Sequence, residues 1–293
     1  MRVMIFGAGY SGKAIGRLLS GQGASVAGTT RSVEKGAALK TAGIEPFVFD
    51  GSSLTPELEA ALKDVTHLVQ SIAPGADGDP LVRLFGAGGL KAAMPKLEWV
   101  CYLSTVGVYG DHQGAWVDET SELKPVSVRS VERVEAEEAW QRLADREAVP
   151  LAILRLSGIY GPGRNTFMNL ANGTARRLVK KDQVFNRIRV EDIAEATAFL
   201  AGPCTGGIFN VTDDEPCPPQ DVVTEAAHLM GMEPPPEQAF ETAELTPMAR
   251  SFYGENKRVS NAKIKALGFN FRYQNYHVSL DALLASGTWN QRA

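Results

Sequence analysis

Residues 2–12 read RVMIFGAGYSG, and this stretch decides the fold class. The run at 2–6 is mostly apolar, is too short for a buried helix and ends at a glycine, so it predicts a fully buried strand of a parallel sheet. After the glycines, apolar residues recur at helical spacing between positions 14 and 19. A strand, a glycine loop and a helix in this order predict the first unit of a doubly wound sheet.

The three glycines of this loop, Gly7, Gly9 and Gly12, have the spacing of a dinucleotide-binding turn. Gly7 permits the tight turn, Gly9 allows the close approach of a pyrophosphate, and Gly12 brings the helix close to the sheet. The amides at the start of the helix, including those of Tyr10 and Ser11, would then face the phosphates. We therefore expect this loop to bind a dinucleotide; the alternative is a tight turn without a ligand.

The end of the second predicted strand indicates which dinucleotide binds. An NAD site needs a carboxylate there to accept a hydrogen bond from the ribose 2′-hydroxyl, whereas this chain has Thr29, Thr30 and Arg31. Thr30 and Arg31 can instead hold the 2′-phosphate of NADP, so NADP is favoured over NAD; the alternative is a plain surface arginine. Asp50, which closes the third strand, either accepts from the adenine amino group or only caps the strand.

Strands alternate with helices along most of the first 200 residues. The predicted strands are 24–28, 46–49, 67–72, 98–103 and 151–156, and the clearest predicted helices are 131–148 and 191–201. This alternation predicts an α/β protein with a Rossmann-type doubly wound parallel sheet and a smaller, interleaved C-terminal substrate lobe. We expect the dinucleotide-binding domain at 1–160 and about 184–202, and the lobe at about 161–183 and 203–288. The basic run at 176–181 has helical spacing and indicates a solvated face or a contact with a substrate phosphate.

Composition narrows the class of protein. The 293 residues are 44% hydrophobic and 22% charged with a net charge of −4, which predicts a globular protein and no binding of nucleic acid. No apolar run approaches the roughly 20 residues of a membrane span, so we expect no membrane association and a cytoplasmic location. Three cysteines and four histidines have no zinc-ligand spacing, so no metal is expected.

Four motifs, taken in order, resemble those of the short-chain dehydrogenase/reductase superfamily, and specifically its extended branch of nucleotide-sugar epimerases and dehydratases. They are the glycine loop, STVGVYG at 104–110, RLSGIYGPG at 155–163 and RIRVEDIAEA at 187–196. In the last two, Gly158 stands at the family's Asn position and Arg189 at its His position. The resemblance spans most of residues 1–200 and implies the fold expected above, with NAD(P) as cofactor and a small molecule as substrate.

The family's chemistry rests on a Ser or Thr, a Tyr and a Lys, and this chain keeps only the first. Thr105 matches the Ser/Thr position, where it would polarise the substrate oxygen. With Pro125, Ser127 and Glu137 fixing the register, Arg129 stands at the Tyr position and Arg133 at the Lys position. A guanidinium has no acceptor lone pair and cannot be a base near neutral pH. Arg133 could still hold the nicotinamide ribose, as the lysine does. The pattern is similar to atypical members that keep the fold and lack the tyrosine.

Another group could replace the missing phenol. Tyr109 and Tyr160 both follow predicted strands, and either could act if Arg129 or Arg133 lay beside it; the alternative is that both tyrosines pack structurally. Glu132 is a weaker candidate for a base, since a glutamate beside arginines is usually a surface ion pair. His112, near Tyr109 in the sequence, is a weak candidate for an acid or base.

The resemblance supplies the remaining expectations. Ser71 follows the fourth strand, where the family's backbone lines the cofactor ribose. A pair of arginines near the nicotinamide suits an anionic substrate. Extended relatives often form dimers through the helix equivalent to 131–148, so a homodimer is considered beside a monomer. We expect an NADP-binding oxidoreductase or epimerase-like protein acting on a small, anionic or nucleotide-sugar-like substrate. The alternative is a non-catalytic sensor that reports the redox state of NADP to a partner.

Overall fold

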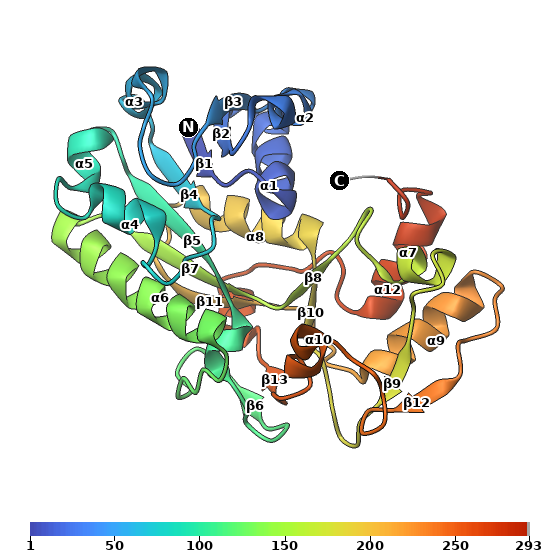
Figure 1. The fold of residues 1–293 in the computed structure, drawn as a ribbon. Helices are drawn as coiled ribbons and strands as arrows, with labels where there is room; N and C mark the ends of the chain where they lie inside the picture. The colour runs from blue at the N-terminus through green and yellow to red at the C-terminus, as the bar shows by residue number, and fades with distance from the viewer. Residues whose placement is uncertain (292–293) are drawn as a thin grey trace. The chain divides into compact units, whose positions relative to one another are not determined.

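A computed structural model describes residues 1–291, and its main element is a seven-stranded sheet (Figure 1). The strand order is β11-β7-β5-β4-β1-β2-β3. The strands are β1 (Arg2–Phe6), β2 (Ser25–Thr30), β3 (Glu45–Val48), β4 (His67–Gln70), β5 (Trp99–Thr105), β7 (Leu151–Leu156) and β11 (Gly207–Val211). The pairs β1–β2, β1–β4, β2–β3 and β4–β5 are all parallel. The predicted Rossmann-type α/β fold is confirmed.

The strand order contains a reversal next to β1. From β1 the chain adds β2 and β3 on one side, and then returns to place β4, β5, β7 and β11 on the other. Ligands of open α/β sheets bind at such a switch point, outside the carboxyl ends of the strands. The loops after β1 and β4 both leave the sheet there.

Helices cover both faces of this sheet (Figure 1). One face carries α1 (Tyr10–Gly21) and α8 (Val190–Ala201), and the other carries α4 (Pro80–Phe85), α5 (Leu90–Ala93) and α6 (Val128–Glu147). The connections also hold α2 (Gly36–Thr41), α3 (Pro56–Leu62) and the short 3₁₀ helices η1 (Val33–Lys35) and η2 (Val106–Tyr109). Fully buried apolar side chains, among them Phe6, Val100 and Trp140, form a core between the sheet and the second group of helices.

Two segments differ from the sequence expectation. The sequence predicts residues 207–211 in the smaller lobe, yet they form the edge strand β11 of the main sheet. Phe209 and Val211 are buried there, but glycines and a proline next to this short strand conceal the pattern in the sequence. The basic run has helical spacing, yet Arg177–Val179 form a strand, β9, which pairs with β12 (Glu237–Ala239).

By its internal contacts the chain divides into two units, which we describe separately. The first comprises residues 1–108, 128–155 and 193–209, and the second comprises 109–127, 156–192 and the chain from Asn210 onward. The second unit contains the strand pairs β8 (Gly158–Tyr160) with β10 (Arg187–Arg189) and β6 (Trp116–Val117) with β13 (Arg258–Val259). Its helices are α7 (Thr166–Ala171), α9 (Pro219–Leu229), α10 (Pro247–Ser251), α11 (Ala262–Ala266) and α12 (Tyr276–Ala285). Within residues 1–291, no helix is long and apolar enough to cross a bilayer.

Candidate functional site

The glycine loop turns sharply after β1, and Gly7 is the residue that requires glycine. Its φ is +82°, and a Cβ added there would lie 2.8 Å from Cγ1 of Ile72 and 3.0 Å from the Ile72 backbone nitrogen. The Gly7 amide donates to Oγ1 of Thr29 over 2.9 Å, and the Ala8 amide donates to the Thr29 carbonyl over 2.9 Å. Thr29 itself is buried. This threonine at the end of β2 therefore fixes the shape of the loop, a role that the sequence did not indicate.

Gly12 and Gly9 differ in what surrounds them. A Cβ on Gly12 would lie 3.0 Å from the Gly7 carbonyl oxygen and 3.1 Å from Cγ2 of Ile5, so a larger residue would push α1 away from the sheet. A Cβ on Gly9 would meet only the Gly7 oxygen, at 3.9 Å. Packing around position 9 therefore leaves room for a side chain, and equally for a ligand lying against the backbone.

The first turn of α1 is suited to an anion. Gly9 is its N-cap residue, no side chain of residues 1–291 caps the turn, and the turn itself holds no acidic residue. Backbone N–H groups and the helix dipole at such a terminus attract phosphate. Tyr10 and Ser11 lie in this turn, as the sequence predicts. The loop and the first turn of α1 therefore have the open backbone and the charge that suit a pyrophosphate.

The end of β2 presents Thr30, which is half-buried, and Arg31, which is exposed. The nearest carboxylate along the chain is Glu34 in η1, which sequence reasoning did not consider. It is exposed, and a hydrogen bond from Ser32 lowers its pKa. Asp50 is also exposed, and its Oδ1 accepts from both the amide (2.8 Å) and the hydroxyl (2.7 Å) of Ser52. One carboxylate oxygen of Asp50 is therefore already engaged in the local turn with Ser52.

The loop after β4 lies against the glycine loop. Ser71 is half-buried and its amide donates to the Phe6 carbonyl over 2.9 Å. The far end of the loop is held by Asp79, which caps α4 through the amides of Leu81 and Val82 and accepts from Nε2 of Gln70 at 2.9 Å. Both ends of this loop are therefore anchored at the switch point.

The positions of the family's catalytic motif lie on β5 and α6. Thr105 ends β5, is half-buried, and accepts at Oγ1 from the Gly107 amide over 3.1 Å. Arg129 is exposed in the first turn of α6. Arg133 is half-buried against β5, where its Nη1 donates to the Leu103 carbonyl at 2.7 Å and to the Tyr102 hydroxyl at 3.0 Å.

Tyr102 is a phenol beside a cation, which sequence reasoning missed because the residue lies within a strand. Its ring is fully buried and stacks on Trp140, with 6.1 Å between ring centroids. Burial raises its pKa far more than Arg133 lowers it. The phenol therefore stays protonated and packs in the core, so it is no substitute for the missing tyrosinate.

Two further motif residues form a buried ion pair inside the first unit. Glu137 on α6 accepts from Nη2 of Arg155 at 2.7 Å, from Nε of the same residue at 3.2 Å, and from the Ser104 hydroxyl at 2.5 Å. Glu137 and Arg155 have side-chain exposures of 3% each. These residues connect α6, β5 and β7, which is a structural role.

The tyrosines proposed as replacements lie in the second unit, and both have buried hydroxyls. Tyr109 is fully buried and donates to Oδ1 of Asn210 over 2.7 Å. The hydroxyl of Tyr160 is shielded from solvent, and burial raises its pKa. These positions favour the structural alternative for both.

Of the weaker candidates, Glu132 is half-buried on α6, and the His112 ring contacts the Glu122 carbonyl at 3.2 Å.

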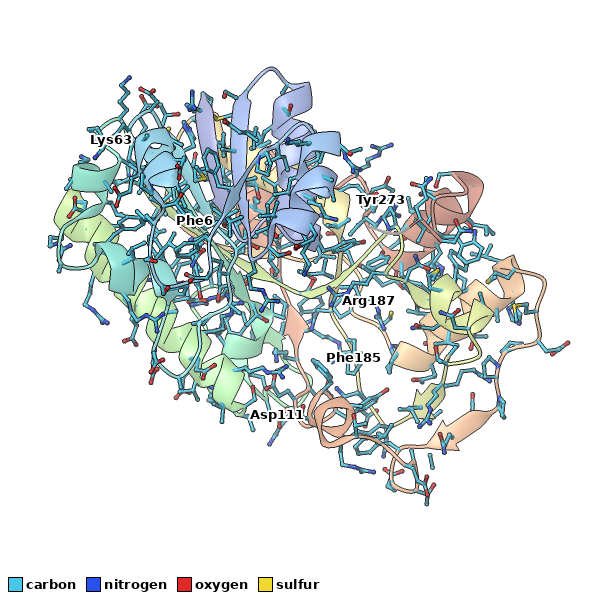
Figure 2. All side chains as sticks on the ribbon, turned by 45° about the horizontal axis from the view of Figure 1, so that its top comes forward. Phe6, Lys63, Asp111, Phe185, Arg187 and Tyr273 are labelled. Atoms are coloured by element: carbon cyan, nitrogen blue, oxygen red, sulfur yellow. The ribbon has the colours of Figure 1, made fainter. Side chains whose placement is uncertain are left out.

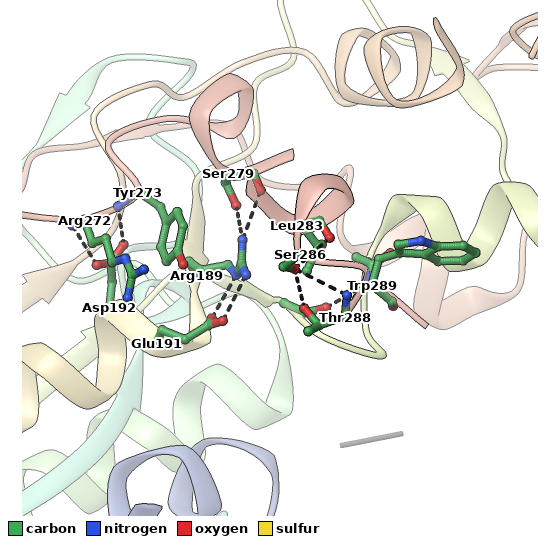
Figure 3. Close-up of polar contacts among 12 residues, drawn as sticks. Arg189, Glu191, Asp192, Arg272, Tyr273, Ser279, Leu283, Ser286, Thr288 and Trp289 are labelled. Carbon is green, nitrogen blue, oxygen red and sulfur yellow. Dashed lines mark hydrogen bonds and ion pairs between the residues drawn. The ribbon is translucent and has the colours of Figure 1, made fainter. Parts of the chain in front are cut away.

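The motif at 187–196 holds the C-terminal segment of the second unit together (Figure 3). Arg189 is buried and donates to both carboxylate oxygens of Glu191, at 2.8 and 2.9 Å, and to the carbonyl (3.0 Å) and hydroxyl (2.9 Å) of Ser279. Asp192 accepts from the amides of Arg272 at 2.8 Å and Tyr273 at 3.0 Å. Burial raises the pKa of Asp192 to about 6.

Two charged residues of the second unit, Arg187 and Asp213, lie close enough to influence each other electrostatically. Arg187 is half-buried beside the Phe185 ring (Figure 2) and donates to Sγ of Cys217 over 3.0 Å. Asp213 is buried, and among the described residues no hydrogen-bond donor reaches its Oδ2. Burial raises its pKa well above the usual range, and Arg187 acts in the opposite direction. Sequence reasoning missed this pair, and the only signal for it is the position of Arg187 in the fourth motif.

Comparisons with known proteins agree with this geometry. The family model "NAD dependent epimerase/dehydratase family" matches residues 3–211. A functionally unknown conserved protein from Silicibacter pomeroyi is 45% identical, with a TM-score of 0.89 over 97% of this chain and 98% of that one. Protein YeeZ of Escherichia coli is 28% identical, over 93% of this chain and 96% of its own. The human epimerase family protein SDR39U1, in a structure with NADPH, shares the fold at 17% identity and a TM-score of 0.75, over 97% of this chain and 99% of that one.

Proposed function

Because this chain belongs to the NAD-dependent epimerase/dehydratase family, we propose that it binds NADP through its glycine loop and acts as an oxidoreductase or epimerase-like protein on a small anionic substrate. The observation that carries the proposal is the contrast among the loop glycines. Gly7 and Gly12 have no room for a side chain, whereas Gly9 faces open space at an uncapped helix terminus. That arrangement fits a pyrophosphate.

The preference for NADP rests on Arg31. An exposed guanidinium after β2 can form a bidentate contact with a 2′-phosphate. The nearest carboxylate along the chain, Glu34, already accepts from Ser32. Thr30 adds a hydroxyl donor at the same edge of the sheet.

Thr105 and Arg133 are proposed to orient the reacting groups. A bound nicotinamide supplies hydride exchange, and Thr105 would donate its hydroxyl proton to the substrate oxygen. Both hydrogen bonds of Arg133 within the first unit use Nη1, so Nη2 and Nε can donate to ribose hydroxyls. The half-buried guanidinium of Arg187, in the second unit, is a cation suited to an anionic ligand.

Fluorescence titration with NADPH and NADH tests the proposal directly. We expect the wild type to bind NADPH more tightly, and Gly9→Ala to weaken binding of both dinucleotides at least tenfold while leaving thermal stability unchanged. Gly88→Ala is the matched control, because a Cβ there meets no atom within 4 Å and Gly88 lies between α4 and α5, outside the glycine loop. Absence of binding by the wild type, or equal binding by Gly9→Ala, would overturn the proposal.

A second candidate function follows from the missing tyrosinate. Tyr102, Tyr109 and Tyr160 all have buried hydroxyls, and the motif's Tyr and Lys positions hold arginines. A cofactor-dependent sensor needs no proton relay and fits the same cofactor site. Oxidation of NADPH by any member of a panel of carbonyl compounds supports the enzyme. Tight NADPH binding without turnover, together with a partner whose affinity differs between NADPH and NADP⁺, supports the sensor.

A further inference from the structure

The amino-terminal edge of the sheet holds a second cluster of chemically active side chains. His67 is the first residue of β4, Glu98 immediately precedes β5, and Cys204 lies in the turn between α8 and β11. All three belong to the first unit. Because β1 and β4 are parallel, the glycine loop leaves the opposite edge of the sheet. The cluster is therefore separate from the cofactor site.

The three side chains bring one nitrogen, one sulfur and one oxygen close together. Their ligand atoms all lie within 4.8 Å of one another, and Sγ of Cys204 is 3.6 Å from Nε2 of His67. Ordinary Zn–N and Zn–S bond lengths with a tetrahedral angle require a nitrogen–sulfur separation of about 3.6 Å. Nε2 of His67 and Sγ of Cys204 therefore already have the spacing that a tetrahedral ion needs.

The imidazole is held in an orientation that suits metal binding. Its Nδ1 lies 2.8 Å from Oγ1 of Thr66, which in turn contacts the amide (3.0 Å) and carbonyl (3.1 Å) of Arg2. In this arrangement Nε2 donates its proton to the Ala201 carbonyl over 3.1 Å, and Nδ1 accepts from the Thr66 hydroxyl. Because Oγ1 of Thr66 can also accept, the proton can sit on Nδ1 instead, which frees the Nε2 lone pair for a metal ion. A metal-bound histidine typically has its other nitrogen fixed in this way.

The cysteine is fixed from the other side. The Trp99 indole nitrogen donates to the Thr205 carbonyl over 2.9 Å, next to Cys204, and the Trp99 ring lies 5.8 Å from the His67 ring. The Ala201 carbonyl lies 3.1 Å from Nε2 of His67 and, with water, is a candidate for the fourth position.

We propose that His67, Cys204 and Glu98 bind a divalent cation of the zinc class at the amino-terminal edge of the sheet. A mixed set of imidazole, thiol and carboxylate donors suits zinc better than magnesium or calcium, which prefer oxygen. On binding, Cys204 releases its proton to solvent and forms a metal–sulfur bond. The ion would join β4, β5 and the α8–β11 turn and so stabilise the first unit.

The test uses full-length, tag-free protein treated with chelator and then titrated with Co²⁺ and Zn²⁺. We expect one Co²⁺ per chain, visible bands of a tetrahedral ion, a thiolate-to-cobalt charge-transfer band, and displacement of Co²⁺ by Zn²⁺. Zinc should also raise the unfolding temperature. Cys204→Ser should lose the charge-transfer band and bind at least tenfold more weakly, and Glu98→Gln should weaken binding while keeping the band.

Cys204 is half-buried and Glu98 is exposed, so these variants test the site even if substitution of the buried His67 prevents folding. Cys101→Ala and Glu59→Gln are the matched controls, and both should bind like the wild type. A wild type without the charge-transfer band, or a Cys204→Ser variant with unchanged cobalt affinity, would show that the cluster is only a hydrogen-bonded network. NADPH titration of the same samples separates this result from the fate of the proposed function.

Discussion

At the scale of single residues, the side chains at the glycine loop divide into those that shape it and those that face outward. Thr29 and Ile72 contact the loop backbone, whereas Arg31 is exposed. An exposed charge contributes little to stability, so substituting Arg31 isolates its effect on the ligand.

We predict that Arg31→Ala weakens NADPH binding about 10- to 100-fold, because a charge-assisted hydrogen bond to phosphate contributes roughly 1.5–3 kcal/mol. NADH binding should be unchanged, because NADH lacks the 2′-phosphate. Isothermal titration with both dinucleotides measures the two affinities. Arg142→Ala, on the exposed face of α6, is the control, and an equal loss for NADPH and NADH would assign Arg31 a different role.

The sequence predicted residue roles where the reason is local, and failed where the reason is tertiary. Gly7 and Gly12 follow from the turn that any strand–loop–helix unit needs. The buried hydroxyl of Tyr109 donates to Asn210, which is 101 residues away, and no local pattern reports that contact. His67, Glu98 and Cys204 likewise lack ligand spacing in the sequence, because the sheet and not one motif brings them together.

At the scale of elements, α6 shows how one helix carries two different kinds of residue. Its exposed face bears Glu138 and Arg142, paired over 3.5 Å with side-chain exposures of 61% and 70%. Its inner face bears Glu137, which reaches Arg155 on β7. The adjacent glutamates Glu137 and Glu138 are therefore expected to contribute very differently to stability.

We predict that Glu137→Gln lowers the free energy of unfolding by about 3 kcal/mol or more, because it leaves the Arg155 guanidinium buried without its counter-charge. Glu138→Gln should change it by less than about 0.5 kcal/mol, as an exposed pair would. Urea unfolding followed by circular dichroism measures both. Similar small losses in the two variants would mean that water reaches Arg155.

Elements were predictable where apolar runs are bounded by clear signals. The strands at 2–6 and 151–156 match the sequence expectation residue for residue, and α6 begins three residues before its predicted start. The strand β11 was misplaced because Gly207 and Asn210 interrupt its apolar residues and its flanks resemble a loop. The burial that defines such an edge strand comes from its neighbour in the sheet and not from its own pattern.

At the scale of the whole molecule, the motifs describe the chain up to residue 211 far better than the chain beyond it. The family model ends at residue 211. Beyond that point the chain is held by hydrogen bonds to residues that are far away in the sequence. Asp192 is the clearest example, since its carboxylate accepts the amides of residues 272 and 273 some 80 positions away (Figure 3). The Asp192 carboxyl also titrates in a pH range in which unfolding can be measured.

We predict that Asp192 makes the protein less stable as the pH rises from about 4 to above 6. Its pKa in the folded protein is about 6, against an ordinary value of 3.8, so the folded state holds this proton more tightly than the unfolded state does. Between those values the free energy of unfolding therefore falls as pH rises. The whole fall is roughly 3 kcal/mol, because raising a pKa by one corresponds to about 1.4 kcal/mol.

Other carboxylates titrate in the same range, so the comparison is between the wild type and Asp192→Asn, which cannot ionise. The asparagine side chain has only one oxygen that can accept from the two backbone amides at any pH. This loss shifts the free energy of unfolding of the variant by an amount that does not change with pH. The difference in unfolding free energy, wild type minus variant, should be larger at pH 4.5 than at pH 7.5. A difference that is constant with pH would mean that the buried carboxyl keeps an ordinary pKa. A difference that is larger at pH 7.5 would mean that its pKa is lowered and that its ionised form stabilises the C-terminal segment.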